Sequence, residues 1–336
     1  MIDIVGNNLL SPVVLFFVMG LIASFMKSDL KFPGGLSEAL TIYLLIAIGL
    51  KGGIELSEHS YADMVRPIMG ALLLGIIIPI VTLIICRKSG LDLKNAIGLA
   101  ASYGSVSIVT YGAAVAFLNH VQMDYESYMS AMVVIMESPA ILVSLLLLKI
   151  MEQKRNSTLL SSNMGIVAGP SSNNWIDYSV IRESLFGKSV LLLVGSLLVG
   201  VFVGHDALPV IRPVFIDLYG GILILFLLNM GLIAGQRLSD IRQYGLTLIL
   251  MGIFMPVIFG AVGVLVGNAC GLSVGGMTLM GVLAGSASYI AAPAALRSSV
   301  PEANPSIYLG MSLGITFPFN LTLGIPIYLE MAKFIQ

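Results

Sequence analysis

The sequence has few charged residues. Asp, Glu, Lys and Arg make up 10% of the 336 residues, whereas they make up about a quarter of a typical soluble domain. Hydrophobic residues account for 57%. A soluble domain of this length could not bury so much apolar surface behind so few charges. The composition therefore predicts a protein with several membrane-spanning helices, and the net charge of −1 gives no sign of a nucleic-acid-binding surface.

Cysteine and the common catalytic motifs are also scarce. The two cysteines, Cys86 and Cys270, can form neither a zinc site nor a disulfide framework, so we expect them to be packing residues. The patterns HExxH, GxGD, GxSG and GxxxxGK[ST] are missing from the sequence, which argues against an intramembrane protease and against a protein driven directly by ATP. We expect neither an enzyme nor a bound cofactor. The start MIDIVGNNLL lacks the basic segment of a cleaved signal peptide, so the first apolar run is expected to be retained.

Apolar runs long enough to cross a bilayer recur along the chain. The ten predicted spans are 9–27, 36–56, 66–86, 95–118, 127–150, 186–204, 215–236, 244–268, 275–297 and 306–334. One long polar connection, 151–185, is rich in Ser, Asn and Gly and reads as a flexible linker. It separates a first five-helix half, 1–150, from a second, 186–336. The predicted fold class is an all-α polytopic membrane protein.

The Lys and Arg residues divide unevenly between the two sides of the predicted membrane. Four lie on one side, namely Lys51, Arg66, Arg212 and Lys333, and the remaining thirteen of the 17 lie on the other. Because positive loops stay in the cytoplasm, the thirteen mark the cytoplasmic side. This predicts a membrane protein with both termini outside and the linker inside. Lys51 and Glu55 lie one helical turn apart and are expected to neutralise each other.

Three sequence matches indicate an internal repeat. Residues 49–57 and 231–239 both read Gly-Leu-x-x-Gly-x-x-Leu-Ser, and GLDL at 90–93 resembles GLSV at 271–274. GSVSIVTYGAAV, 104–115, matches GSASYIAAPAAL, 285–296. All three matches occur in the same order at nearly the same offset. Since five helices are an odd number, the second half enters the membrane from the opposite side. Inverted repeats of this kind are typical of secondary transporters.

The third matching pair predicts two helices that are interrupted near the midplane. Glycines, hydroxyl side chains and Pro293 are concentrated there, and irregular backbone at that depth is tolerated only inside protein or beside water. The N-terminus of a half-helix offers free N–H groups to a small anion. Close helix packing is the alternative reading of such small residues. The predicted substrate-binding residues are Gly104, Ser105, Ser107, Gly285, Ser286, Ser288 and Tyr289.

Polar residues inside other spans are candidates for a cation site. Glu137 lies about ten residues from each end of its span and is the best candidate for a buried carboxylate that binds sodium or a proton. A structural salt bridge is the alternative. Thr110, Thr316 and Asn320 are further candidates for this cation site, whereas Asn229 is expected to form an interhelical hydrogen bond.

Several segments resemble the sodium-dependent bicarbonate transporters first known from cyanobacteria. The most specific is Asn304-Pro305-Ser306-x-Tyr308-x-Gly310, which follows Val300-Pro301. YGSVSIVT at 103–110, MESPAI at 136–141 and Gly49-Leu50-x-Gly52-Gly53 also fit the family. Glu137 stands where the family has an acid, and Tyr289 replaces one.

The resemblance implies a mobile core against a fixed scaffold, a homotrimer, and inward cotransport of sodium with bicarbonate. It also implies a location in a bacterial inner membrane and a PII-like regulatory protein as a cytoplasmic partner. Our leading hypothesis is thus a sodium-coupled importer of bicarbonate or a similar small anion that works by alternating access. The alternatives are a receptor or scaffold that has lost transport and signals through the linker, and a passive anion channel.

Overall fold

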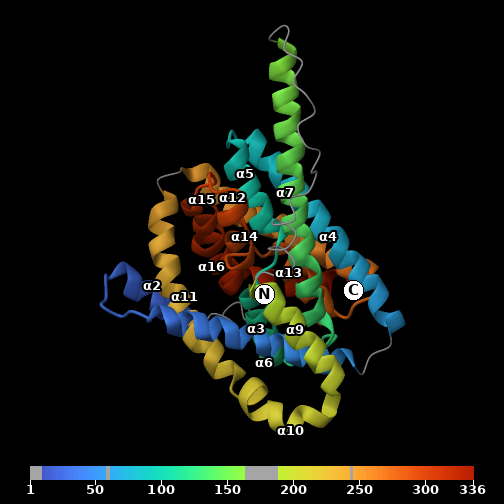
Figure 1. Cartoon of the computed structure of the whole chain (residues 1–336). Coiled ribbons are helices and arrows are strands. Elements are labelled where there is room, and N and C mark those ends of the chain that lie inside the picture. The colour runs from blue at the N-terminus through green and yellow to red at the C-terminus, as the bar shows by residue number, and fades with distance from the viewer. Residues whose placement is uncertain (1–9, 58–60, 163–187, 243–244) are drawn as a thin grey trace.

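The computed structural model describes residues 10–57, 61–162, 188–242 and 245–336. Every element in these ranges is helical (Figure 1). In chain order, the elements are α2 (Pro12–Phe25), α3 (Gly34–Leu56), α4 (Tyr61–Lys88), α5 (Leu93–Gly104), α6 (Ile108–His120), α7 (Met129–Ser162), α9 (Lys188–Val203), η1 (Gly204–Ala207), α10 (Leu208–Ile211), η2 (Arg212–Asp217), α11 (Tyr219–Arg242), α12 (Leu246–Ala269), α13 (Val274–Gly285), α14 (Ala291–Ser299), α15 (Pro305–Leu309), η3 (Gly310–Thr316), α16 (Phe317–Phe319), η4 (Asn320–Gly324) and α17 (Ile325–Ile335).

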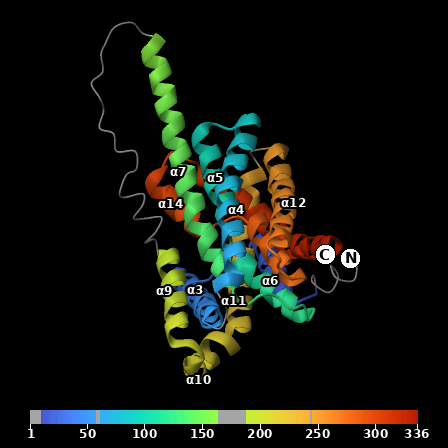
Figure 2. The same ribbon diagram turned by 90° about the vertical axis from the view of Figure 1, so that its right-hand side faces the viewer.

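The lengths and apolar composition of these helices fit a multi-pass membrane protein. Within the described ranges, 7 helical stretches are long and apolar enough to cross a bilayer. Three further apolar helices, Pro12–Phe25, Leu191–Val203 and Val274–Gly285, are shorter than a full crossing. The predicted linker is partly helical, because α7 continues to Ser162 and projects beyond the other helices (Figures 1 and 2). The rest of that linker, 163–185, lies outside the described residues.

Four helices, α2, α3, α9 and α11, form what we call the scaffold group. Here α3 packs along α9, and α11 packs along α2, so each pair joins one helix from each half of the chain. In both pairs the backbones of the two helices are in direct contact. A Cβ added at Gly53 would overlap the carbonyl oxygen of Leu197, and one added at Gly231 would overlap that of Phe17. Small residues at such crossings are what allow membrane helices to approach closely.

This packing explains the first sequence repeat. Gly49 and Gly53 of α3 lie against Ser196 and Gly200 of α9, while Gly231 and Gly235 of α11 lie against Gly20 and Ser24 of α2. The glycines of the motif Gly-Leu-x-x-Gly-x-x-Leu-Ser thus serve helix packing in both halves. Asn229 donates to the Ser37 hydroxyl at 2.7 Å, which confirms the expected interhelical hydrogen bond between α11 and α3.

The helices α4 to α7 and α12 to α17 form what we call the core group. Within it α5 packs against α4 and α7, and α13 packs against α12 and α17. Lys94 at the start of α5 forms ion pairs with Glu152 of α7 and Glu302, which ties the ends of the two halves together. Cys86 and Cys270 are free thiols, as expected.

Candidate functional site

Two helices of the core group are interrupted at matching positions. α5 and α13 each contain 12 residues, and each begins after a side chain that accepts a hydrogen bond from the first turn, Asp92 in α5 and Ser273 in α13. Each ends in a serine with extended backbone. Ser105 has φ −79° and ψ 158°, and Ser286 has φ −90° and ψ 169°. The chain therefore leaves the helix in the same way at both sites.

The glycine at the end of each helix lies where a side chain would not fit. A Cβ at Gly104 would collide with the ring of Pro79, and one at Gly285 with the Tyr328 hydroxyl and the Pro256 carbonyl oxygen. Pro79 and Pro256 both lie inside the long helices that precede the interrupted ones, α4 and α12. These close contacts hold the two helix ends deep in the core group.

The extended segments that follow α5 and α13 cross and bind each other. The Ser107 amide donates to the Ser286 hydroxyl at 3.0 Å, and the Ser288 amide donates to the Ser102 carbonyl oxygen at 2.7 Å. All four of these serines are buried. Two of the amides that the breaks remove from the helices, those of Ser107 and Ser288, are therefore satisfied across the crossing, as burial in an apolar environment favours.

The helices resume beyond the crossing with matched serine contacts. The Ser107 hydroxyl accepts from the Thr110 amide at 3.2 Å, and the Ser288 hydroxyl accepts from the Ala292 amide at 3.2 Å. The N-termini of α6 and α14 are therefore close to the crossing, as are the C-terminal ends of α5 and α13. Helix N-termini carry partial positive charge and C-termini partial negative charge, so one small region presents both polarities.

Pro293 does not cause the second interruption, contrary to the sequence-based expectation. It lies in the first turn of α14, where a proline is readily accommodated because that N–H has no helical partner. The break lies before it, at 286–290. Gly112, one of the glycines of the first motif, lies inside the continuous helix α6, where the Tyr219 hydroxyl occupies the space that its Cβ would fill.

A small cavity adjoins the crossing and contains the one acidic candidate of the sequence analysis. Its volume is about 10 Å³, which is room for about one water molecule or a bare monovalent cation. Glu137 of α7 contributes the carboxylate and is only 7% exposed. The lining residues are Val106, Ser107, Ile108, Glu137, Ser288, Tyr289 and Ile290. A carboxylate beside several hydroxyls is an oxygen-rich environment of the kind that hard cations prefer.

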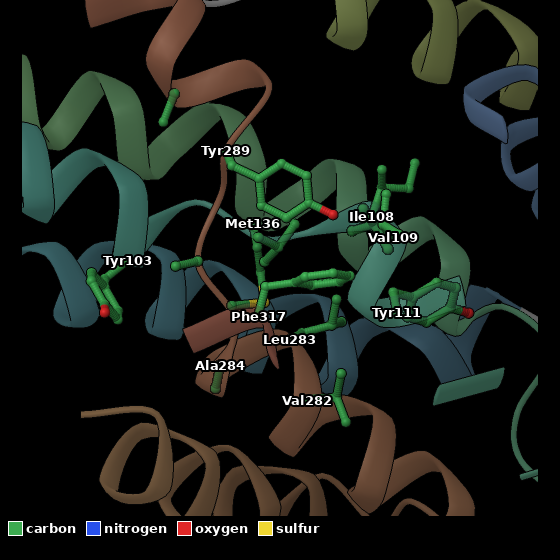
Figure 3. Packing of buried hydrophobic residues seen from close by; sticks show 14 of the residues in the cluster. Tyr103, Ile108, Val109, Tyr111, Met136, Val282, Leu283, Ala284, Tyr289 and Phe317 are labelled. Carbon is green, nitrogen blue, oxygen red and sulfur yellow. The ribbon is translucent and has the colours of Figure 1, made fainter. Parts of the chain in front are cut away.

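Tyr289 closes this region against the last transmembrane segment. Its ring packs edge-on against Phe317, with ring centroids 5.3 Å apart, and its hydroxyl is directed toward Ile108 at the start of α6 (Figure 3). The hydroxyls of Ser102 and Ser105 are buried and have no hydrogen-bond partner among the described residues, and the buried Tyr289 hydroxyl interacts with Ser107. Because an unpaired buried hydroxyl is costly, Ser102 and Ser105 are the hydroxyls at the crossing that gain most from a polar ligand.

The remaining candidates lie at different distances from this cavity. Thr110 adjoins it, since its hydroxyl donates to that of Ser107 at 2.9 Å. Thr316 and Asn320 do not line it. Thr316 is hydrogen-bonded to the Tyr103 hydroxyl and the Gly252 carbonyl oxygen, and Asn320 donates to the Gly285 carbonyl oxygen at 2.8 Å. Thr316 thus links α5 to α12, and Asn320 braces the end of α13.

Sequence reasoning missed the apolar residues around the cavity and the form of the last segment. Val106, Ile108 and Ile290 alternate with the serines and gave no signal of their own. η3 and η4 are π-helical turns, and Thr316 and Asn320 lie within them. Such turns frequently mark functional sites, but no residue pattern in 306–334 indicated them.

Comparison with known proteins agrees with this geometry. No individual curated protein matches the sequence. The sequence profile of the Na+-dependent bicarbonate transporter superfamily matches residues 12–333, which is nearly the whole chain and includes both interrupted helices, Glu137 and the scaffold group. The chain therefore belongs to the Na+-dependent bicarbonate transporter superfamily.

Proposed function

We propose that the protein imports bicarbonate, or a similar small anion, together with sodium by alternating access. The observation that carries the proposal is the crossing of two interrupted helices beside a buried carboxylate. In this proposal the chain spans the membrane ten times, as two inverted five-helix repeats. The equal lengths and matched caps of α5 and α13, together with the reciprocal pairing of α3 with α9 and α11 with α2, support that arrangement.

The anion binds at the crossing, near the N-termini of α6 and α14. Gly104, Ser105, Ser107, Gly285, Ser286, Ser288 and Tyr289 surround this position. The unpartnered hydroxyl of Ser105 and the hydroxyl of Tyr289 supply donors, and the helix N-termini supply partial positive charge. A preformed set of donors of this kind offsets the desolvation of an anion that leaves water.

Sodium binds on the Glu137 side of the same crossing. The cavity beside Glu137 has the size of a bare cation, and the hydroxyls of Ser107 and Thr110 adjoin it. Together the Glu137 carboxylate, sodium and a monovalent anion carry one net negative charge, the same as the carboxylate alone. Without sodium, the anion would raise this buried charge from one to two negative, so the anion binds well at the crossing only when sodium is also bound. Coupling follows from this charge balance.

Uptake of labelled bicarbonate into proteoliposomes tests the proposal. Inward sodium gradients should drive accumulation, and replacing sodium by potassium on both sides should abolish it. Accumulation that is equal without sodium would contradict the coupling, and flux that only dissipates a bicarbonate gradient would indicate a channel. The homotrimer, the inner-membrane location with both termini outside, and a PII-like partner on the cytoplasmic side stay predictions from the family resemblance and from the distribution of Lys and Arg.

A further inference from the structure

A second and larger cavity lies between the scaffold group and the core group. Its volume is about 290 Å³, which is close to the lower end of cavities that bind small ligands, about 300 Å³. α3, η2 and α11 form one wall, and α6 and the start of α7 form the other. The lining residues are Ala47, Ile48, Lys51, Tyr111, Val115, Ala116, Asn119, Tyr125, Ser127, Ser130, Phe215, Ile216, Tyr219 and Gly220.

The charge that the described lining residues bring to this cavity is of one sign only, positive. Among its described lining residues, Lys51 is the one charged side chain, and no carboxylate contributes to the wall. Lys51 is half-buried on α3. The other polar groups are hydroxyls and an amide, which can donate hydrogen bonds. A concave, largely apolar space with a single positive charge concentrates small anions from the surrounding solution. The side chain of Glu55, the partner expected from the sequence, lies outside what the structure describes.

The cavity leads along α6 toward the crossing. At one end it reaches Asn119, which is exposed near the end of α6, and at the other it reaches Tyr111. The Tyr111 amide donates to the Ser107 carbonyl oxygen at 3.0 Å, which places the inner end of the cavity one helical turn from the crossing. Lys51 lies on the side of the membrane that the distribution of Lys and Arg assigns as outside.

We propose that this cavity is the outer vestibule of the transporter and that Lys51 is its anion-binding residue. The anion binds there transiently, held by the ammonium group and the surrounding hydroxyls, before it moves along α6 to the crossing. The inference rests on the proposed function for the identity of the anion. The proposal requires that the Lys51 ammonium group faces the cavity and is not neutralised by Glu55, and the resulting positive potential can be tested without transport.

The first experiment compares uptake by three variants in proteoliposomes. Lys51→Gln should raise the KM for bicarbonate about tenfold with little change in kcat, and Lys51→Arg should keep KM within about twofold of the unsubstituted protein. Raising the ionic strength should increase KM for the unsubstituted protein and much less for Lys51→Gln, because salt screens the charge. Lys333→Gln is the matched control, since Lys333 lies on the same predicted side, pairs with Glu330 and does not line the cavity. An unchanged KM for Lys51→Gln would overturn the proposal.

The second experiment measures the potential directly in detergent. Val115→Cys places a thiol on the cavity wall, in a background in which Cys86 and Cys270 are replaced by Ala. The ratio of its labelling rates by an anionic and a cationic methanethiosulfonate should exceed one. Adding Lys51→Gln should lower that ratio about tenfold, whereas adding Lys333→Gln should leave it unchanged. An equal ratio of labelling rates with and without Lys51 would overturn the proposed vestibule, even if uptake is observed. A ratio that depends on Lys51 in a protein without bicarbonate uptake would instead contradict only the proposed cargo.

Discussion

The two interrupted helices are alike up to the break and differ after it. α5 and α13 have the same length, the same kind of N-cap and the same extended serine at their ends. In the first half the helix resumes at Ile108, directly after Ser107, whose side chain caps it. In the second half, the extended segment is longer, and α14 begins only at Ala291. Ile290, which precedes it, provides no side-chain cap, and the Ser288 hydroxyl two residues earlier accepts from the first turn instead. The longer segment is what brings Tyr289 over the first interruption.

The chemistry of the two halves also differs. Glu137 lies on α7, and at the offset of 181 residues that separates Gly104 from Gly285 the second half has Pro318. The second half thus contributes an aromatic hydroxyl at Tyr289 but no acid to the cavity. The comparison shows a shared backbone frame that carries different polar side chains in its two halves. In the proposed function, the frame places both ligands and the asymmetry distinguishes the cation from the anion.

The strongest test of this asymmetry removes the negative charge of the Glu137 carboxylate. Glu137→Gln should lower sodium-dependent uptake by about 100-fold, because the cation loses its carboxylate, an interaction of about 3 kcal/mol. The protein should unfold at the same temperature or a higher one, since a buried carboxylate without a cation is itself costly. Uptake and Tm measured on the same preparation separate the two effects.

Glu152→Gln is the matched control for Glu137→Gln. Glu152 lies on the same helix, α7, but pairs with Lys94 at the surface and lines neither cavity. Its substitution should leave the sodium dependence unchanged. If Glu137→Gln retained full coupling, the carboxylate would have no part in the cation site, and the site would have to use groups common to both halves.

The two helix contacts of the scaffold group, α3 with α9 and α2 with α11, test whether the two halves of the chain pack equivalently where no ligand is proposed to bind. Gly200→Ala on α9 and Gly231→Ala on α11 should each destabilise the protein by about 3 kcal/mol, because the added Cβ overlaps a backbone carbonyl oxygen of the facing helix. Gly195→Ala and Gly221→Ala are controls on the same two helices, where a Cβ meets nothing within 4 Å. These should be neutral or slightly stabilising. Thermal unfolding in detergent measures both pairs, and a large effect at only one crossing would contradict their equivalence.

The matched serines Ser105 and Ser286 should separate stability from function. The Ser286 hydroxyl accepts from the Ser107 amide and donates to the Leu283 carbonyl oxygen at 2.9 Å, whereas that of Ser105 has no partner among the described residues. Ser286→Ala should therefore cost about 2 kcal/mol of stability, and Ser105→Ala close to nothing. Ser105→Ala should instead raise the KM for the anion. The reverse pattern would mean that Ser105 is structural and Ser286 is the ligand.

The sequence predicted the positions of the helices and the interruptions but not the contacts between them. Hydropathy and the glycine-serine clusters are local signals, and the breaks at 105–107 and 286–290 fall within or beside the predicted segments. Whether Gly53 serves packing or a site depends on α9, which is far away in the chain, and the same holds for Gly231 and α2. Glu137 was recognised because a carboxylate in an apolar run is unusual, yet its neighbours Ser288 and Tyr289 come from the other half. Pro293 was misread because a proline breaks a helix only when it lies beyond the first turn.

The smallest expected difference concerns the caps of α5 and α13. Burial of the Asp92 carboxyl acts to raise its pKa, but hydrogen bonds from the Asn95 backbone and side chain outweigh this and lower the pKa below its usual value. The stabilisation from this cap is therefore present above the unfolded pKa of about 3.9 and is lost as the pH falls through the lower native value. Asp92→Ala should cost about 1 kcal/mol at neutral pH, and Ser273→Ala a similar amount.

The pH dependence distinguishes the two caps. Asp92→Asn retains a side chain that caps a helix as well as aspartate does, so it should match the unsubstituted protein at pH 7. Near pH 3 the unsubstituted protein should lose part of its Tm advantage over Asp92→Ala, whereas Asp92→Asn should keep its own, because an amide does not titrate there. Ser273→Ala provides the comparison with a cap whose hydroxyl carries no charge. If Asp92→Asn and the unsubstituted protein followed the same acid profile, the carboxylate charge of Asp92 would contribute nothing to the α5 cap, and hydrogen bonding alone would account for both helix starts.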